Sequence, residues 1–213
     1  NSRVAGDGQK ALGGMKRKVS QNRPGIATGW GDEIKSNVSV GSFRRASSSP
    51  ASLSTIYYND KEGIKAMTSS WRYSGSGMQK AGNGLVEWGV KSSWGYLKNV
   101  HSSGKRFVVG TQGRTYSLVV KNIAHSALEV VLSVDGLDVL DGKPASIKKR
   151  GYIIQPGKTL VVKGFRKSED AVAAFKFSTV RDSYSSLSNQ GTRNVGVMGM
   201  AIFTQKGVSP WRY

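Results

Sequence analysis

The sequence has 213 residues and a formal net charge of +19, from 32 basic and 13 acidic side chains, and it contains no cysteine. The lack of cysteine excludes disulfides, thiolate metal sites and cysteine nucleophiles, but it fits both a cytosolic and an extracellular setting. No apolar run reaches the about 18 residues that a membrane-spanning helix needs. A charge of this size attracts polyanions such as nucleic acid, anionic lipid or acidic polysaccharide.

The positive charge is spread evenly along the chain. Residues 1–105 carry 16 basic and 6 acidic side chains, a net charge of +10, and residues 106–213 carry 16 and 7, a net charge of +9. A basic nucleic-acid arm on a neutral domain would show a strong asymmetry between the two parts. Nucleic acid is therefore not the first choice of partner.

Residues 1–55 read as an extended, basic, Gly/Ser-rich arm. Gly-Gly, Pro-Gly and Ser-Ser-Ser-Pro sequences interrupt this part too often for a regular element. Residues 34–43 alternate between apolar and polar side chains and could form one strand, which would pair with the edge of another subunit. A disordered tail is the equally weighted alternative.

Residues 56–105 form an aromatic, Gly-rich segment with one short strand expected at residues 85–90. Trp71, Trp88 and Trp94 lie here among several tyrosines. Exposed aromatic rings can stack on sugars or bases. Aromatic residues in such a segment more often pack on a core or anchor a chain to a neighbour, and we favour packing.

Residues 106–213 carry the pattern of a compact β-domain. Asp135-Gly136, Asp141-Gly142 and Pro156-Gly157 are turn sequences. Short alternating runs with no helical periodicity between them predict an all-β, antiparallel β-sandwich or jelly roll behind the long irregular N-terminal arm. Residues 168–175 have a composition that would also suit a helical turn. The expected strands are residues 107–110, 115–122, 128–134, 137–140, 152–154, 159–165, 171–177 and 195–204.

Three sequence blocks in this β-domain carry a family resemblance. They read VDGLDVLDGKPAS, GYIIQPGKTLVVKGFRKSEDAVAAFKF and NVGVMGMAIF, and they occur in this order within residues 115–204. Together they resemble a family of uncharacterised β-domain proteins from bacteria, in which tryptophan is common at the position of Phe165. The resemblance implies a β-domain and export, and it implies no catalytic residues.

No group of residues predicts catalysis or a cofactor. His101 and His125 are the two histidines, and neither lies in a recognisable catalytic motif, so we read them as surface or structural residues. Asp135, Asp138 and Asp141 supply oxygen ligands at close spacing, as calcium loops do. Their two Asp-Gly turns explain the same residues, so we expect no metal site.

Two basic clusters are candidate contacts for a polyanion or a neighbouring subunit. The densest run of basic residues, next to Lys143, is Lys148, Lys149 and Arg150. Together with the pair Arg166 and Lys167 it forms an expected anion-binding face. The second cluster lies on the arm, at residues 16–18 and at Arg44 and Arg45. Solvated surface charge explains any single run, whereas the total of +19 favours a polyanionic neighbour.

The first functional hypothesis is a non-enzymatic structural subunit of a large extracellular or virus-like assembly. Its expected partners are copies of itself and other subunits, contacted by Trp30, Arg44, Arg45, Trp71 and Trp88. The alternatives are an exported module that binds an acidic glycan or other polyanion, and a capsid-type protein that packages nucleic acid. Because the chain begins at Asn1, we expect a processed protein located outside the cell or on a particle surface.

Overall fold

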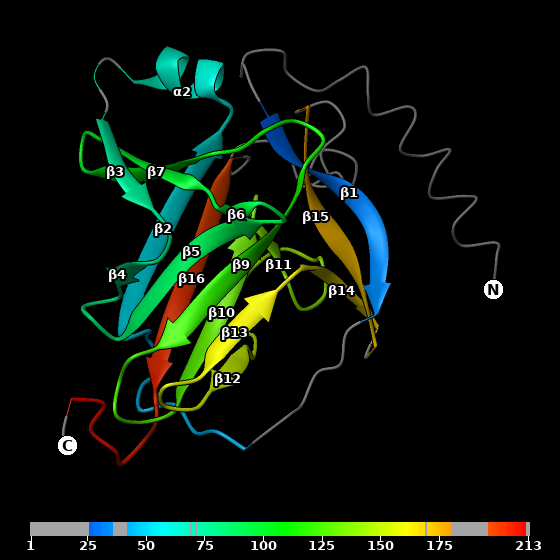
Figure 1. The fold of residues 1–213 in the computed structure, drawn as a ribbon. Helices are drawn as coiled ribbons and strands as arrows, with labels where there is room; N and C mark the ends of the chain where they lie inside the picture. The colour runs from blue at the N-terminus through cyan, green and yellow to red at the C-terminus, as the bar shows by residue number, and fades with distance from the viewer. Residues whose placement is uncertain are drawn as a thin grey trace.

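The computed structural model describes residues 26–35, 42–68, 70, 72–168, 170–179 and 196–211. In this part of the chain two β-sheets pack face to face as a β-sandwich, with one short helix at one end (Figure 1). The prediction of an all-β sandwich is confirmed. The described strand pairs are antiparallel except for one parallel pair, β2 (Ser52–Asn59) with β8 (Lys105–Val109).

The first sheet pairs the first described strand with a strand from late in the chain. Its strands run in the order β1 (Ile26–Lys35), β15 (Ala171–Thr179), β9 (Thr115–Asn122), β5 (Val86–Ser92) and β4 (Gln79–Ala81). Three further strands pair beside this path: β13 (Thr159–Val162) on β9, β14 (Gly164–Ser168) on β15, and β6 (Gly95–Tyr96) on β5.

The second sheet has β2 near its centre. Its order is β11 (Leu137–Asp138), β10 (Leu128–Val134), β16 (Val197–Thr204), β2, β8, β7 (Lys98–Ser102) and β3 (Arg72–Ser76), and β12 (Tyr152–Ile154) pairs with β10. The helix α2 (Lys61–Met67) follows β2. Its first turn is capped by the Asp60 carboxylate, which accepts a hydrogen bond from Gly63 N at 2.6 Å.

The core lies between the sheets and follows from the two-residue period of the strands. In β9, for example, Tyr116, Leu118 and Val120 are buried and belong to the central apolar cluster. The ring of Tyr116 stacks on Phe177 of β15 with 4.3 Å between ring centroids. Tyr58 of the second sheet reaches the same Phe177 at 5.6 Å, so the aromatic core joins the two sheets.

Polar contacts add to this connection between the sheets. Trp88 Nε1 of the first sheet donates to Ser54 Oγ of the second at 2.9 Å. Arg106 of the second sheet donates one hydrogen bond to Trp88 O and another from its Nε to Asn99 Oδ1, each at 2.9 Å. Burial lowers the pKa of Arg106 to about 10.

Most expected strands of the β-domain are confirmed, three of them with the expected bounds: β9, β10 and β12. The expected strand at residues 159–165 is two strands, because β13 pairs with β9 and β14 with β15. At the switch a Cβ on Gly164 would lie 2.0 Å from Ala173 O, so only glycine allows this backbone approach. The alternative of a helical turn at residues 168–175 is wrong, since Ala171–Thr179 is a strand.

The expected arm needs correction where the structure describes it. Residues 26–35 form β1, which pairs with β15 along its length. Residues 42–51 run beside β16, and β2 begins at Ser52 inside the second sheet. Most of the strand expected at residues 34–43 lies outside the described residues; of its ends, Ile34 and Lys35 belong to β1, and residues 42–44 are irregular. Residues 1–25 and 36–41 lie outside the described residues.

Candidate polyanion-binding loop

The densest basic run lies in an irregular loop between β11 and β12, residues 143–150, here called the basic loop. It begins after the two Asp-Gly turns and is folded by short-range hydrogen bonds. Lys149 N donates to Ser146 O at 3.1 Å, and Lys148 N donates to Ser146 Oγ at 3.2 Å. Ala145 N reaches back to Gly136 O at 2.9 Å, which holds the start of the loop against the hairpin turn.

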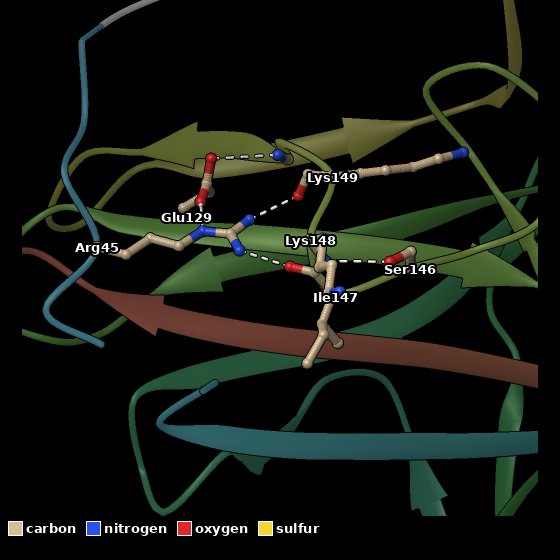
Figure 2. Close-up of polar contacts among 7 residues, drawn as sticks. Arg45, Glu129, Ser146, Ile147, Lys148 and Lys149 are labelled. Carbon is tan, nitrogen blue, oxygen red and sulfur yellow. Dashed lines mark hydrogen bonds and ion pairs between the residues drawn. The ribbon is translucent and has the colours of Figure 1, made fainter. Parts of the chain in front are cut away.

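A single arginine fixes the basic loop to the outer face of the second sheet. Arg45 donates from its three guanidinium nitrogens to Glu129 Oε1 at 2.5 Å, Ile147 O at 2.5 Å and Lys149 O at 2.6 Å (Figure 2). Its guanidinium lies 3.6 Å from the ring centroid of Phe203. One cation therefore connects a strand carboxylate, an aromatic side chain and two loop carbonyls.

Glu129, a residue of strand β10, accepts hydrogen bonds from both Arg45 and the backbone at the end of the loop. Its side chain is 6% exposed, and its second oxygen accepts a hydrogen bond from Gly151 N at 3.2 Å, just after the loop. A buried carboxylate needs a charged partner and hydrogen bonds to offset its lost hydration. Arg45 and Gly151 supply both, so the loop and its anchor form one satisfied network.

The charges of the basic loop fall into two groups. Lys149 Nζ binds Asp141 at 2.9 Å, and its side chain extends away from Arg45 (Figure 2). Partial burial acts to raise the pKa of Asp141, but hydrogen bonds from Lys149 and Lys143 N outweigh it and lower this pKa. Lys148 and Arg150 are exposed and form no ion pair within the described residues. Together with Lys143, they are the exposed basic side chains of the loop.

The second part of the expected anion-binding face meets the loop at the turn that carries Asp141. Arg166 N donates to Val139 O at 2.7 Å, and its half-buried side chain hydrogen-bonds Tyr152. Burial raises the pKa of Tyr152, and Arg166 opposes that rise. Lys167 follows with an exposed side chain. This backbone contact places Arg166 beside the turn that precedes the basic loop.

The three aspartates do not share a site. Asp135 and Asp138 are buried, whereas Asp141 lies at the surface. Burial raises the pKa of Asp138, whose Oδ1 accepts from Leu140 N at 2.8 Å. No cluster of three or more potential metal ligands is found in the described ranges.

The two histidines also lie apart. His101 Nε2 lies 3.1 Å from Gln79 Oε1 at the end of β7. His125 has an exposed side chain, and its backbone N donates to Pro210 O at 2.8 Å.

Two of the expected assembly residues make their contacts within the chain itself. Trp88 is fully buried in the core of its own chain, so its side chain has no surface to offer a neighbour. Arg45 is committed to Glu129 and the basic loop. Arg44 is exposed, which leaves it available for contact. The side chain of Trp30 and the whole of Trp71 lie outside the described residues.

Glu129 is the residue that sequence reasoning missed. It is a lone acid in the apolar strand LEVVLSV, and a charge at such a position signals a buried partner. That signal does not name Arg45, which lies 84 residues earlier in the chain.

The fold and this loop define the class as an all-β sandwich protein with an anchored basic loop. No protein-family model, curated protein or solved structure matches the chain. Among the described residues, helix α2 included, there is no helix with the length and apolar character to cross a membrane.

Proposed function

We propose that the protein is a non-enzymatic module that binds an acidic polymer through the basic loop. The observation that carries this proposal is the anchoring of the loop by Arg45. Two loop carbonyls are fixed, so Lys148 and Arg150 are presented from an ordered backbone. A preordered loop loses less conformational entropy on binding than a free one. The net charge of +19 adds long-range attraction for the same class of ligand.

Retention on an immobilised acidic polysaccharide tests the proposal. Replacing Lys148 and Arg150 by alanine together should lower the salt concentration needed for elution. The matched control replaces Lys61 and Lys65, two exposed lysines on helix α2, which removes the same charge far from the loop. If both double variants elute alike, net charge alone explains retention and the loop is not the binding site. Copurified nucleic acid with absorbance near 260 nm would favour the packaging alternative instead.

A structural subunit of a large extracellular or particle-like assembly is the second candidate. The observation that favours it is strand β3, an edge of the second sheet in which all five residues are exposed. Such an edge offers backbone groups for strand addition by another chain. On the outer face of the same sheet, Leu53 is 67% exposed beside a hollow of about 220 Å³ that Ile147 also lines.

The fold changes how the assembly proposal is tested. A deletion of residues 1–55 would remove β1 and part of β2, so the informative truncation stops at residue 25. If residues 1–25 mediate assembly, their removal should convert oligomers into folded monomers by light scattering. Oligomers of unchanged size would contradict that role. A Ser74→Lys variant, with a charge on the β3 edge, tests strand addition separately.

A further inference from the structure

A groove of about 510 Å³ lies on the outer face of the first sheet. It is a separate region from the basic loop, which packs on the outer face of the second sheet. Strands β5, β9 and β13 carry most of its lining. Val119 and Val161 give it an apolar part, while Ser117, Thr115 and Thr159 line it with hydroxyl groups. Such a mixed lining suits a ligand that has both C–H faces and hydroxyls.

Aromatic side chains lie in this groove and next to it. Tyr96 lines it directly, and Trp94 follows the lining residue Ser93 in the turn between β5 and β6. Trp94 is 79% exposed, the highest value among the large hydrophobic side chains described as exposed. The Arg114 guanidinium lies 3.7 Å from the Trp94 ring centroid, so the ring is oriented while most of its surface stays open.

The groove is also positively charged. Lys91 and Lys163 line it, and Arg114 lies beside it. None of these three cations forms an ion pair within the described part of the chain. The acid on the neighbouring stretch of β5, Glu87, lies directly opposite Lys121 in the β5–β9 register. Three cations are therefore available for an anionic ligand.

Charge also argues against the chain's own N-terminal segment as the occupant. Residues 1–25 contain six basic side chains and one acidic side chain. A segment of this sign would be repelled by Lys91, Lys163 and Arg114. The occupant that complements the groove is an external anion.

We propose that the groove binds a segment of an acidic polysaccharide, with a sugar ring stacked on Trp94. Carboxylates of the polymer pair with Lys91, Lys163 and Arg114, and the Ser and Thr row hydrogen-bonds its hydroxyls. This site does not depend on the basic loop. A test of the groove can therefore fail while a test of the basic loop succeeds, because the two regions lie on different sheets and are altered by different substitutions.

Binding of a hexauronate oligosaccharide to the full chain, measured by calorimetry and tryptophan fluorescence, tests this site. Trp94→Ala should weaken binding by on the order of tenfold, and Trp94→Phe should restore most of the affinity because a stacking ring remains. Lys163→Ala should weaken binding and reduce its salt dependence. The charge-matched control is Lys148→Ala in the basic loop, which should leave binding of this short ligand within about twofold.

Three results would overturn the proposal. The first is full affinity in a folded Trp94→Ala variant. The second is equal binding of a neutral hexasaccharide, which would remove the role of the cations. The third is tighter binding of a thymidine hexanucleotide than of the hexauronate, which would make the groove a single-stranded nucleic-acid site. Since Trp94 is largely exposed, its replacement should leave the fold intact, and circular dichroism checks this.

Discussion

Asp135 is a buried residue on which several segments of the sandwich converge. Its Oδ2 accepts hydrogen bonds from Thr28 N at 3.1 Å and Tyr58 Oη at 2.5 Å, and its Oδ1 accepts from Gly196 N at 2.6 Å and Val197 N at 3.3 Å. The carboxylate is 3% exposed. These contacts tie the β10–β11 turn to β1, β2 and the start of β16. They offset the cost of burying a charged group.

Removing one donor from this network should destabilise the fold. Tyr58→Phe keeps the ring in the core but leaves Asp135 Oδ2 without the tyrosine O–H. We expect a loss of about 1–3 kcal/mol in the free energy of unfolding, measured with urea. Tyr57→Phe, at the half-buried neighbouring position, is the control and should change stability by less than about 0.5 kcal/mol. Equal effects of the two variants would argue against the network.

The same tyrosines predict a loss of stability in alkali. Burial, followed by the nearby charge of Asp135, raises the pKa of Tyr58 and Tyr116 well above the ordinary value of 10.0. At pH values below 10.0 both tyrosines are protonated in the folded and unfolded states, so their contribution to the free energy of unfolding does not change with pH. Above this pH the unfolded chain releases these protons and the folded chain does not, so stability falls as pH rises. Unfolding curves measured from about pH 8 to pH 11 check this, and Tyr116→Phe should flatten the dependence. An unchanged slope in that variant would contradict it.

Gly151, which follows the basic loop, lies so close to the backbone of β10 that a larger residue should not fit. A Cβ there would lie 2.1 Å from Val130 O, an atom of the sheet backbone that cannot move aside cheaply. Gly151→Ala should destabilise the protein by about 1–3 kcal/mol. Gly104, with φ of +73° and open space around it, is the comparison. Its replacement by alanine introduces φ strain without a clash, at a cost of about 1 kcal/mol. The clash interpretation fails if Gly151→Ala is as stable as the parent.

At the scale of elements, the position of the basic loop depends on one arginine that is distant from it in the sequence. Arg45→Ala removes the partner of buried Glu129 and frees two loop carbonyls, so we expect a loss of about 3–5 kcal/mol. Amide hydrogen exchange across residues 145–150 should rise to that of an unprotected loop, whereas exchange in β9 should rise by no more than the loss of global stability accounts for. Arg44→Ala, at the exposed neighbouring position, should leave both stability and exchange as they are. Equal exchange in the two variants would show that Arg45 does not hold the loop.

The sequence predicts strands best where the two-residue period and the turn residues agree. This is so for β9, β10 and β12, each of which has a Gly, Asp or Pro turn at one end or at both. It fails for β1, whose sequence IATGWGDEIK has two glycines and no sustained alternation. Pairing with β15, about 145 residues later in the chain, forms that strand, and single-segment patterns do not contain such long-range information.

The candidate site was predictable to a similar extent. Its cations are visible as the run from Lys148 to Arg150, because charge density is a local property of the sequence. Its anchor is not, since Arg45 and Glu129 meet only through tertiary structure. The burial of Trp88 has the same origin, because its partner Ser54 belongs to the opposite sheet. Residue type and local composition alone therefore predict that Trp88 and Arg45 contact other subunits, because they contain no information on tertiary contacts.

At the scale of the whole molecule, the two outer faces of the sandwich carry the two proposed binding regions. The basic loop lies on the second sheet, and the groove lined by Ser93 and Tyr96 lies on the first. A polymer that contacted both faces would gain affinity through linked binding, without any additional contact.

The salt dependence of binding to a long acidic polysaccharide tests the central claim most directly. The slope of log affinity against log salt reports the number of counterions that the protein's cations release. Replacing Lys148 and Arg150 by alanine should reduce this slope by about two, one for each lost contact, while replacing Lys61 and Lys65 should leave it nearly unchanged. Equal slopes for the two double variants would contradict the account, because the basic loop would then contribute no more than any other surface charge.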